Sequence, residues 1–313
     1  MSAFCAAIDW GTTRFRLWLL NDAGRVLDQV QTDDGLQSCI PDRFEAVVDQ
    51  TLAGLGAPAG LPIVICGMAG SSSGWKQAPY VETPAGLDAL ALNSVQVSSP
   101  VRDIRIVPGV CQRSADAPDV IRGEETHLLG AHLTGHSNGL FCLPGTHSKW
   151  AHVDEGVLRD FKTFMTGELF DLLSTHSILK HTHGSVSAPD APGFRTAVEE
   201  MLHDDTGLTG RLFSIRAANL LGQTTPDHSA DRLSGLLIGS EVASVKRHYP
   251  EESQVFLIAS GALEEAYHEA LHLAGFSITT LPADDLVRAG LFSAACQFWK
   301  QADPELAPRA IGA

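Results

Sequence analysis

The chain has 313 residues, of which 44% are hydrophobic, so it is long enough for two domains with a sizeable buried core. Its 37 acidic and 22 basic residues give a net charge of −15, which argues against general nucleic-acid or anionic-membrane binding, because both need a basic face. The six cysteines include no C-x-x-C pair, a pattern typical of reduced cytosolic proteins. No apolar run approaches the roughly 18 residues of a membrane span and no signal peptide is evident, so we expect a soluble cytoplasmic protein.

The first expected elements are two strands joined by a tight turn. An apolar run over residues 4–9 ends in Asp9, Gly11-Thr12-Thr13 follows, and a second strand is expected over 15–20. The tip of this hairpin offers backbone N–H groups, two hydroxyls and one carboxylate. Such groups can hold a nucleotide phosphate together with a hydrated Mg²⁺ ion, and a plain hairpin is the alternative.

A glycine- and serine-rich loop is the next feature of interest. A third strand is expected over 26–31 and a helix over 41–55, followed by a short buried strand over 62–66. The loop over 67–75 follows that strand and closes with Trp75, an unusual residue for a plain connection. We therefore interpret it as a candidate substrate loop, with a flexible connection as the alternative.

Two glutamates open a helix expected over 123–133, after a strand over 104–108 and a loop over 110–122. Acidic residues in a first helical turn are favoured by the helix dipole, so they can be simple capping residues. A carboxylate here could instead accept the proton of a substrate hydroxyl during phosphoryl transfer. Glu124 is the candidate for that base, and Glu125 and Asp119 are its alternatives. The polar stretch over 134–139 is the expected domain boundary.

The second half of the chain repeats the pattern of the first. A strand over 140–143 runs into Pro144-Gly145-Thr146-His147-Ser148-Lys149, and strands over 150–153 and 157–164 follow. The spacing from the tip glycine to the next turn glycine is 13 residues in the first half and 11 in the second. Two copies of one unit imply duplicated lobes. Their two tips could hold a triphosphate from two sides.

The rest of the chain is expected to be mostly helical. Helices are expected over 168–179, 193–203, 210–221, 232–248, 262–274 and 284–299, strands over 254–260 and 276–281, and a loose tail over 302–313. Ser260-Gly261-Ala262 is a strand–glycine–helix junction, where a flat ring or a phosphate can approach a helix N-terminus. The last helix is apolar nearly all round and is expected to be buried.

Five segments together resemble a known enzyme family. They are Ile8–Thr13, Gly67–Trp75, Arg122–Thr126, Leu143–Trp150 and Phe164–Phe170. The resemblance is to the 2-dehydro-3-deoxygalactonokinases, bacterial sugar-acid kinases of galactonate breakdown, and it covers about residues 4–300. The wider superfamily includes actin, hexokinase and the 70-kDa heat-shock proteins.

The resemblance implies an α/β fold with two ribonuclease-H-like lobes, each a mixed sheet with flanking helices, around an ATP cleft. The N-terminal lobe, 1–135, would hold the first phosphate loop and the sugar-acid site. The C-terminal lobe, 136–313, would hold the second phosphate loop and the adenosine site, and the final helix could pack back on the N-terminal lobe.

The resemblance also implies roles for individual residues. Asp9 would be linked to Mg²⁺, and Glu124 would take the place of the catalytic aspartate of FGGY sugar kinases, one methylene longer. The implied ATP-binding residues are Gly11, Thr12, Thr13, Gly145, Thr146, His147, Ser148, Lys149, Ser260, Gly261 and Ala262. The implied substrate-binding residues are Gly70, Ser71, Ser72, Trp75 and Arg122, with Arg122 and Lys76 as candidate partners of the substrate carboxylate.

The activity implied is phosphorylation of the 6-hydroxyl of 2-dehydro-3-deoxy-D-galactonate by ATP with Mg²⁺. A kinase of a related 2-keto-3-deoxy or aldonic acid is the first alternative, because the orientation of a hydroxyl is invisible in a sequence. A non-catalytic, nucleotide-switched sensor or an actin-like assembly protein is the second. The expected partners are the sugar acid and ATP, without nucleic acid or membrane, and a homodimer is one candidate assembly.

Overall fold

The computed structural model describes residues 2–40, 42–182, 184–186, 188, 191–203 and 207–300. The expected tail over 302–313 lies outside these residues. The chain divides into two compact units, of which unit 1 comprises Met1–Ser137, Gly156–Leu158 and Asp284–Ala313. Unit 2 comprises Asn138–Glu155 and Arg159–Ala283. Nearly all of the C-terminal helix α9 (Ala283–Trp299) therefore belongs to unit 1, although it follows the last strand of unit 2.

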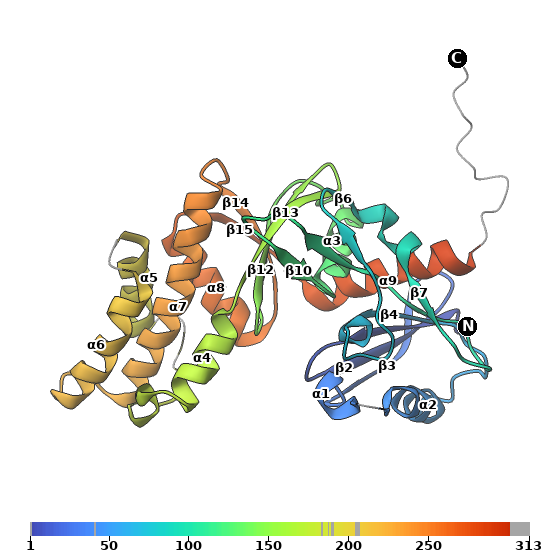
Figure 1. Cartoon of the computed structure of the whole chain (residues 1–313), viewed down its shortest axis with the longest axis horizontal. Coiled ribbons are helices and arrows are strands. Elements are labelled where there is room, and N and C mark those ends of the chain that lie inside the picture. Colours follow the sequence, from blue (N-terminus) through green and yellow to red (C-terminus); the bar gives the residue numbers. More distant parts are fainter. Residues whose placement is uncertain are drawn as a thin grey trace, which may run out of the picture. The chain divides into compact units, whose positions relative to one another are not determined.

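Unit 1 is built on a six-stranded mixed sheet with the order β3-β2-β1-β4-β8-β7 (Figure 1). Its strands are β1 (Cys5–Trp10), β2 (Phe15–Leu20), β3 (Val26–Thr32), β4 (Ile63–Gly67), β7 (Val95–Val97) and β8 (Ile104–Ile106). The first three strands form an antiparallel meander, whereas β1, β4 and β8 run parallel. The predicted N-terminal hairpin is confirmed, because Trp10 lies opposite Phe15.

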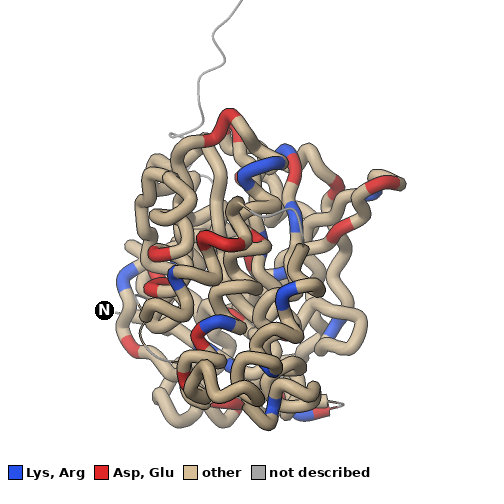
Figure 2. Tube along the Cα trace, turned by 90° about the vertical axis from the view of Figure 1, so that its left-hand side faces the viewer, with Lys and Arg blue, Asp and Glu red and all other residues tan. Residues whose placement is uncertain are grey.

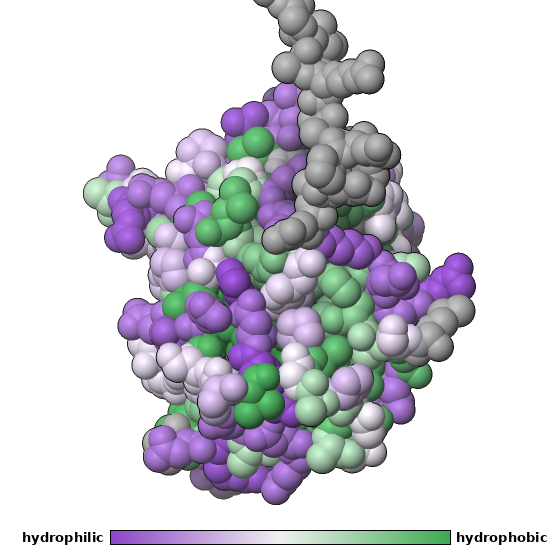
Figure 3. Space-filling model, turned by 90° about the vertical axis from the view of Figure 1, so that its right-hand side faces the viewer, coloured by the Kyte–Doolittle hydropathy of each residue, from purple (hydrophilic) through white to green (hydrophobic). Residues whose placement is uncertain are grey.

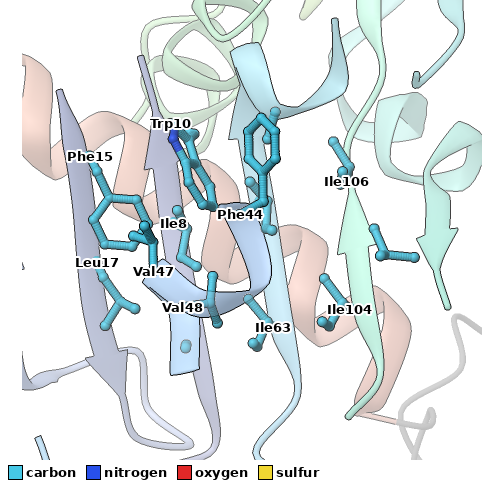
Figure 4. Packing of buried hydrophobic residues seen from close by; sticks show 14 of the residues in the cluster. Ile8, Trp10, Phe15, Leu17, Phe44, Val47, Val48, Ile63, Ile104 and Ile106 are labelled. Atoms are coloured by element: carbon cyan, nitrogen blue, oxygen red, sulfur yellow. The ribbon is translucent and has the colours of Figure 1, made fainter. Parts of the chain in front are cut away.

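Side chains alternate along β1 between two hydrophobic cores. Ile8 and Trp10 pack on the face covered by α2 (Phe44–Gly54), where aromatic and β-branched residues fill the space between helix and sheet (Figure 4). Ala7 packs on the opposite face with residues of α9. Asp9 lies two residues after Ala7 in the strand and therefore points to the same face of the sheet, so its carboxylate lies on the α9 face. The strand thus fixes which helix the carboxylate meets.

Shorter elements complete unit 1. They are α1 (Leu36–Cys39), η1 (Met68–Gly70), η2 (Leu87–Asn93), α3 (Glu124–Leu133), β5 (Tyr80–Glu82), β6 (Ala85–Gly86), β9 (Gly109–Gln112) and β10 (Asp119–Ile121). Strands β10, β9 and β5 form a small separate sheet. The loop expected over 110–122 is therefore wrong. These strands are too short to show a clear period, and β9 pairs with β5, which is distant in sequence.

Unit 2 repeats the meander and the parallel strands of unit 1. The sheet has the order β15-β14-β11-β12-β13, and β6 extends it by pairing with Val157 and Leu158, which belong to unit 1 as β6 does. The strands other than β6 are β11 (Gly139–Leu143), β12 (Ser148–Asp154), β13 (Val157–Phe164), β14 (Gln254–Ala259) and β15 (Ser277–Pro282). Strands β11 and β12 are antiparallel, whereas β11, β14 and β15 run parallel, as β1, β4 and β8 do. The predicted duplication of a mixed α/β unit is confirmed.

The helices of unit 2 are mostly where periodicity placed them. They are α4 (Thr166–Thr175), η3 (Ile178–His181), α5 (Pro192–His203), α6 (Leu208–Leu220), α7 (Pro226–His248) and α8 (Gly261–Leu273). Helix α7 begins earlier than expected, because Thr225 caps it by accepting a hydrogen bond from His228 N at 3.3 Å. Acidic and basic positions are interspersed over the face that these helices present (Figure 2).

Among the described residues, no helix has both the length and the apolar character needed to cross a membrane. On the face shown in Figure 3, apolar side chains form small groups between polar ones. Apolar atoms normally contribute a large share of a folded protein's accessible surface, so small groups of this kind are expected.

Candidate active site

Asp9 lies near the end of β1 and is only 6% exposed. Arg16, its cross-strand partner on β2, forms an ion pair with it. The same guanidinium pairs with Asp284 in the first turn of α9. On the other side, Cys66 of β4 donates a hydrogen bond from Sγ to Asp9 Oδ1 at 3.7 Å. The carboxylate is therefore held on both sides by neighbouring strands.

The hairpin tip beyond Asp9 has a fixed backbone and exposed hydroxyls. The Gly11 N–H donates a hydrogen bond to the Arg14 carbonyl oxygen at 2.8 Å, and this bond closes the turn. Gly35 lies so close to the tip that a Cβ there would be 2.4 Å from the carbonyl carbon of Thr13. The side chains of Thr12 and Thr13 are exposed. The tip can thus offer hydroxyl and N–H groups to an anion without rearranging.

Two glycines bring the start of α3 to the end of β4. Gly67 has φ +85°, and a Cβ there would lie 2.6 Å from the Trp10 carbonyl oxygen. Gly123 has φ +106°, and its Cβ would lie 3.4 Å from Gly67 Cα. Only glycine adopts such φ values without strain, so both positions favour it. As a result, the ends of β1 and β4 and the start of α3 meet in unit 1.

Glu125 caps the start of α3 from inside the unit. It is 1% exposed, and its Oε2 accepts a hydrogen bond from Gly123 N at 2.7 Å. Burial, and then the neighbouring Glu124, raise the pKa of Glu125 to about 7. Burial and the carboxylates of Asp9 and Glu125 raise the pKa of the Cys66 thiol, so the thiol stays a neutral donor. Asp9 and Glu125 therefore act on the same buried thiol.

Glu124 is the more accessible of the two glutamates. It is half-buried, and its Oε2 accepts a hydrogen bond from Arg122 N at 3.0 Å. Asp119, the third candidate, lies on the short strand β10 and accepts a hydrogen bond from Val120 N at 2.7 Å. The first turn of α3 thus carries one committed and one accessible carboxylate at the point where α3 meets the end of β4.

Arg122 has guanidinium atoms that its surroundings do not use. Its Nη2 donates to the Ala78 carbonyl at 3.0 Å, and its Cζ lies 4.4 Å from the ring centroid of Tyr80. Within the described residues, its buried Nε and Nη1 have no hydrogen-bond partner, and neither has the buried Oγ of Ser71. A Cβ on Gly70 would lie 2.8 Å from Nη1. The structure therefore brings Gly70, Ser71 and Arg122 together.

The remaining residues of the predicted substrate loop lie elsewhere. Ser72 is exposed. Trp75 packs on the α2 face of the sheet, with its ring stacked 6.1 Å from that of Phe44. Lys76 Nζ donates to the Gln96 carbonyl at 2.7 Å. Trp75 therefore has a packing role in this structure, and it holds the loop to the core.

In unit 2, two predicted nucleotide elements lie at one edge of the sheet. Strands β11 and β14 are parallel neighbours, so the segments that follow their carboxyl ends leave the sheet at the same edge. Residues 144–147 follow β11, and the exposed junction Ser260-Gly261-Ala262 follows β14 and opens α8. A Cβ on Gly261 would meet nothing within 4 Å. The space beside this glycine is open to a ligand.

The first turn of α4 covers the second tip. Glu168 N donates to the Thr146 carbonyl at 2.9 Å, and His147 Nε2 lies 2.5 Å from Glu168 Oε2. A Cβ on Gly167 would lie 2.5 Å from the Gly145 carbonyl oxygen. Thr146 and His147 remain exposed. The Met-Thr-Gly-Glu stretch therefore closes directly onto the tip.

Ser148 and Lys149 lie beneath the tip. Ser148 is 0% exposed, and its Oγ donates to Glu241 Oε1 at 2.6 Å. Lys149 is 9% exposed, and its Nζ donates to the His147 carbonyl at 2.7 Å. In this structure, both side chains support the tip.

Sequence reasoning missed Arg16, Glu168, Glu241 and Asp284. A signal existed for Arg16, because the predicted hairpin register places it opposite Asp9. Glu168 stands in the Met-Thr-Gly-Glu-Leu motif, which the sequence showed without a role. No local signal marks Glu241, because its partner Ser148 is 93 residues away.

The fit to Mg²⁺ depends on a single carboxylate. Among the described residues, no group of three or more His, Cys, Asp or Glu could hold a metal ion by itself. Mg²⁺ that accompanies a nucleotide usually needs only one or two carboxylates, because phosphate oxygens and waters complete its octahedron. Asp9, beside an exposed hydroxyl-bearing tip, fits such a shared site. Within the described residues, a complete protein cage for Mg²⁺ is not formed.

Comparison with known proteins gives consistent sequence matches. The family model described as 2-keto-3-deoxy-galactonokinase matches residues 9–294. The probable 2-dehydro-3-deoxygalactonokinase of Rhizobium meliloti strain 1021 is 42% identical over 95% of this chain and 98% of its own length. The 2-dehydro-3-deoxygalactonokinase of Escherichia coli K12 is 35% identical over 94% of this chain and 98% of its own length.

Solved structures agree with the sequence matches. A crystal structure of a Sinorhizobium meliloti protein, 42% identical, superposes with a TM-score of 0.92 and covers 95% of this chain and 100% of its own. The Clostridium difficile activator of 2-hydroxyisocaproyl-CoA dehydratase is 12% identical, with a TM-score of 0.53 over 99% of both chains, and shares the fold. The match over residues 9–294 shows that this chain belongs to the 2-keto-3-deoxy-galactonokinase family.

Proposed function

We propose that this protein is a 2-dehydro-3-deoxygalactonokinase, which transfers the γ-phosphoryl group of ATP to the 6-hydroxyl of 2-dehydro-3-deoxy-D-galactonate. The observation that carries the proposal is the family match across residues 9–294. Two relatives with this activity in their names align over 95% and 94% of the chain. The reaction belongs to the breakdown of galactonate.

The nucleotide is assigned to the two hairpin tips and the junction at the start of α8. The N–H groups and hydroxyls of Thr12 and Thr13, and the tip over Gly145–His147, would contact phosphate oxygens, with Gly11 closing the first tip and Ser148 and Lys149 supporting the second. Ser260–Ala262 would meet the adenosine. When bound, Mg²⁺ would be held by Asp9 through water and would neutralise phosphate charge. The exposed tips and the open space beside Gly261 support this assignment.

The sugar acid is assigned to the Gly70–Trp75 loop and Arg122. A substrate carboxylate would accept hydrogen bonds from Arg122 Nη1 and from Ser71 Oγ, which lack partners within the described residues. Gly70 leaves room for the guanidinium, Ser72 is exposed on the same loop, and Trp75 holds the loop to the core. The N-terminal lobe, proposed as 1–135, would thus carry the sugar-acid site. The C-terminal lobe, 136–313, would carry the adenosine site.

Glu124 is assigned as the base. Its carboxylate would take the proton of the 6-hydroxyl as that oxygen bonds to the γ-phosphorus and the bond from phosphorus to the β,γ-bridging oxygen breaks, which releases ADP. Glu125 is committed to the cap of α3, which leaves Glu124 as the accessible carboxylate. Most of the rate enhancement would come from positioning and charge neutralisation.

An ADP-release assay over a panel of 2-keto-3-deoxy and aldonic acids tests the substrate. We expect the highest kcat/KM with 2-dehydro-3-deoxy-D-galactonate, and turnover confined to another acid would replace this substrate assignment. Glu124→Gln should abolish turnover while ATP binding persists, whereas Glu251→Gln, at an exposed site, should leave both unchanged. Turnover that survives in Glu124→Gln would move the base elsewhere. ATP binding without turnover on any acid would favour the sensor alternative.

We also propose a cytoplasmic location and keep a homodimer as the candidate assembly. All six cysteines are free thiols, and reducing compartments keep thiols in that state. Sedimentation at several concentrations would distinguish a dimer from a monomer.

A further inference from the structure

Glu241 is a buried carboxylate that the proposed reaction does not use. It lies in the middle of α7 and is 2% exposed. Its Oε1 accepts hydrogen bonds from Ser148 Oγ at 2.6 Å and Trp150 Nε1 at 2.7 Å. Its Oε2 accepts from Tyr267 Oη at 2.8 Å and from Thr166 Oγ1. Both oxygens are therefore fully used by side-chain donors.

The four donors come from the elements that build the proposed nucleotide site in unit 2. Ser148 and Trp150 belong to β12, which begins where the second tip ends. Thr166 is the first residue of α4, whose first turn covers the tip. Tyr267 lies on α8, the helix that opens at the proposed adenosine junction. One carboxylate is thus hydrogen-bonded to the strand that follows the second tip, to the first turn of α4 and to α8.

This arrangement needs a carboxylate. An ionised glutamate is an acceptor at all its lone pairs and can take four donors, whereas a glutamine amide would point N–H groups at two of them. Burial raises the pKa of Glu241, and the four hydrogen bonds work against that rise. Burying such a charge is unfavourable unless it is fully hydrogen-bonded. The network meets that condition, and two of its four donors lie where the second tip ends and where α4 begins.

We propose that Glu241 is a positioning residue for the nucleotide, holding the second tip, the start of α4 and α8 in the arrangement that binds ATP phosphates. The proposal rests on the assignment of the tip to ATP. The sugar-acid site is assigned to unit 1, apart from this network. The two substrates should therefore respond differently when the network is broken.

The test compares Glu241→Gln with wild type in three measurements: calorimetric binding of Mg-ADP, the KM values for ATP and for the sugar acid, and thermal unfolding. We expect the Kd for Mg-ADP and the KM for ATP to rise about tenfold or more, as loss of charged hydrogen bonds predicts. The KM for the sugar acid should stay within about twofold. Tyr249→Phe, which removes a hydrogen bond to Asp160 in the same unit, is the matched control. It should lower the unfolding temperature and leave nucleotide binding unchanged.

Ser148→Ala serves if Glu241→Gln does not fold, because it removes one donor and keeps the carboxylate. It should raise the Kd for Mg-ADP by a smaller factor, about threefold to tenfold. A lower unfolding temperature with an unchanged Kd in both variants would overturn the proposal and leave Glu241 a purely structural residue. An equal rise in both KM values would also overturn it. Because Mg-ADP binding needs no turnover, an inactive wild type would count against the proposed function alone.

Discussion

Asp9 and Arg16 face each other across the β1–β2 hairpin, and the guanidinium of Arg16 joins Asp9 to Asp284 at the start of α9. The Asp9 side chain is 9% exposed and that of Arg16 is 27% exposed. The ion pair is therefore largely withdrawn from solvent. It balances the charge of Asp9 and ties the strand that leads to the first tip to the last helix of unit 1.

Replacing Arg16 with Gln should destabilise the protein, because the Asp9 carboxylate would keep its burial and lose its cation. We expect the free energy of unfolding to fall by about 1–3 kcal/mol, between the values for exposed and fully buried ion pairs. Arg159→Gln is the control, since Arg159 pairs with Asp154 at the surface and should cost less than about 1 kcal/mol. Urea unfolding measures both. Equal effects would contradict the importance assigned to the Asp9–Arg16 pair.

Glu125 should make stability depend on pH. Its pKa is raised from 4.5 to about 7, so between these values the folded protein binds more protons than the unfolded chain. Stability from this group is then complete at low pH and falls as pH rises, by about 3 kcal/mol in total.

Glu125→Gln should remove this pH-dependent part of the free energy of unfolding, because glutamine does not titrate. The amide oxygen of glutamine can still accept the hydrogen bond from Gly123 N. The free energy of unfolding, measured at several pH values between 4.5 and 8, should therefore fall less steeply in the variant than in wild type. Parallel pH profiles would show that Glu125 titrates alike in folded and unfolded states.

Much of the fold could be predicted because its signals are local. The strand over Phe15–Leu20 and the strand over Val157–Phe164 were predicted with the observed bounds, since the first is a mostly apolar run that ends at the turn residues Asn21-Asp22 and the second begins directly after the turn glycine Gly156. The strands over 109–112 and 119–121 could not be found in this way. The first of them pairs with a distant strand at 80–82, the second pairs with the first, and each is too short to show a period.

In the candidate site too, the features encoded by neighbouring residues could be predicted, whereas contacts between distant residues could not. The tips at Gly11–Thr13 and Gly145–His147 could be found because a turn is encoded by neighbouring residues. The groups that hold them come from distant parts of the chain: Asp284 lies 268 residues from Arg16, and Glu241 lies 93 residues from Ser148. Only the folded structure brings such pairs together.

Gly290 of α9 should not tolerate alanine. A Cβ there would lie 2.3 Å from the Thr126 carbonyl oxygen, and on the facing helix a Cβ on Gly130 would lie 1.9 Å from the Leu286 carbonyl oxygen. Both neighbours are backbone, so α3 and α9 would have to separate, at a cost of about 1–3 kcal/mol or more.

Gly54→Ala is the matched control, because a Cβ at the end of α2 would meet nothing within 4 Å. It should leave the unfolding temperature unchanged or raise it slightly, since alanine favours helix by about 0.5–1 kcal/mol over glycine. Gly290→Ala should lower it by several degrees. An unchanged unfolding temperature in Gly290→Ala would contradict the close contact of the two helices.

Arg122→Lys should weaken binding of the sugar acid and leave ATP binding intact. An ammonium group cannot reproduce the planar guanidinium, which stacks on Tyr80, donates through Nη2 to the Ala78 carbonyl and leaves Nη1 for a carboxylate. We expect the KM for the sugar acid to rise about tenfold or more, with the KM for ATP unchanged.

Arg113→Lys is the control for Arg122→Lys. Its side chain is 69% exposed and pairs with Glu82 at 3.6 Å, so lysine can replace it without loss. Steady-state kinetics with each substrate varied in turn would separate the two KM values. A rise in the KM for ATP alone, or no change in either KM, would show that Arg122 does not bind the sugar acid. Its guanidinium would then have only a packing role beside Gly70 and Tyr80.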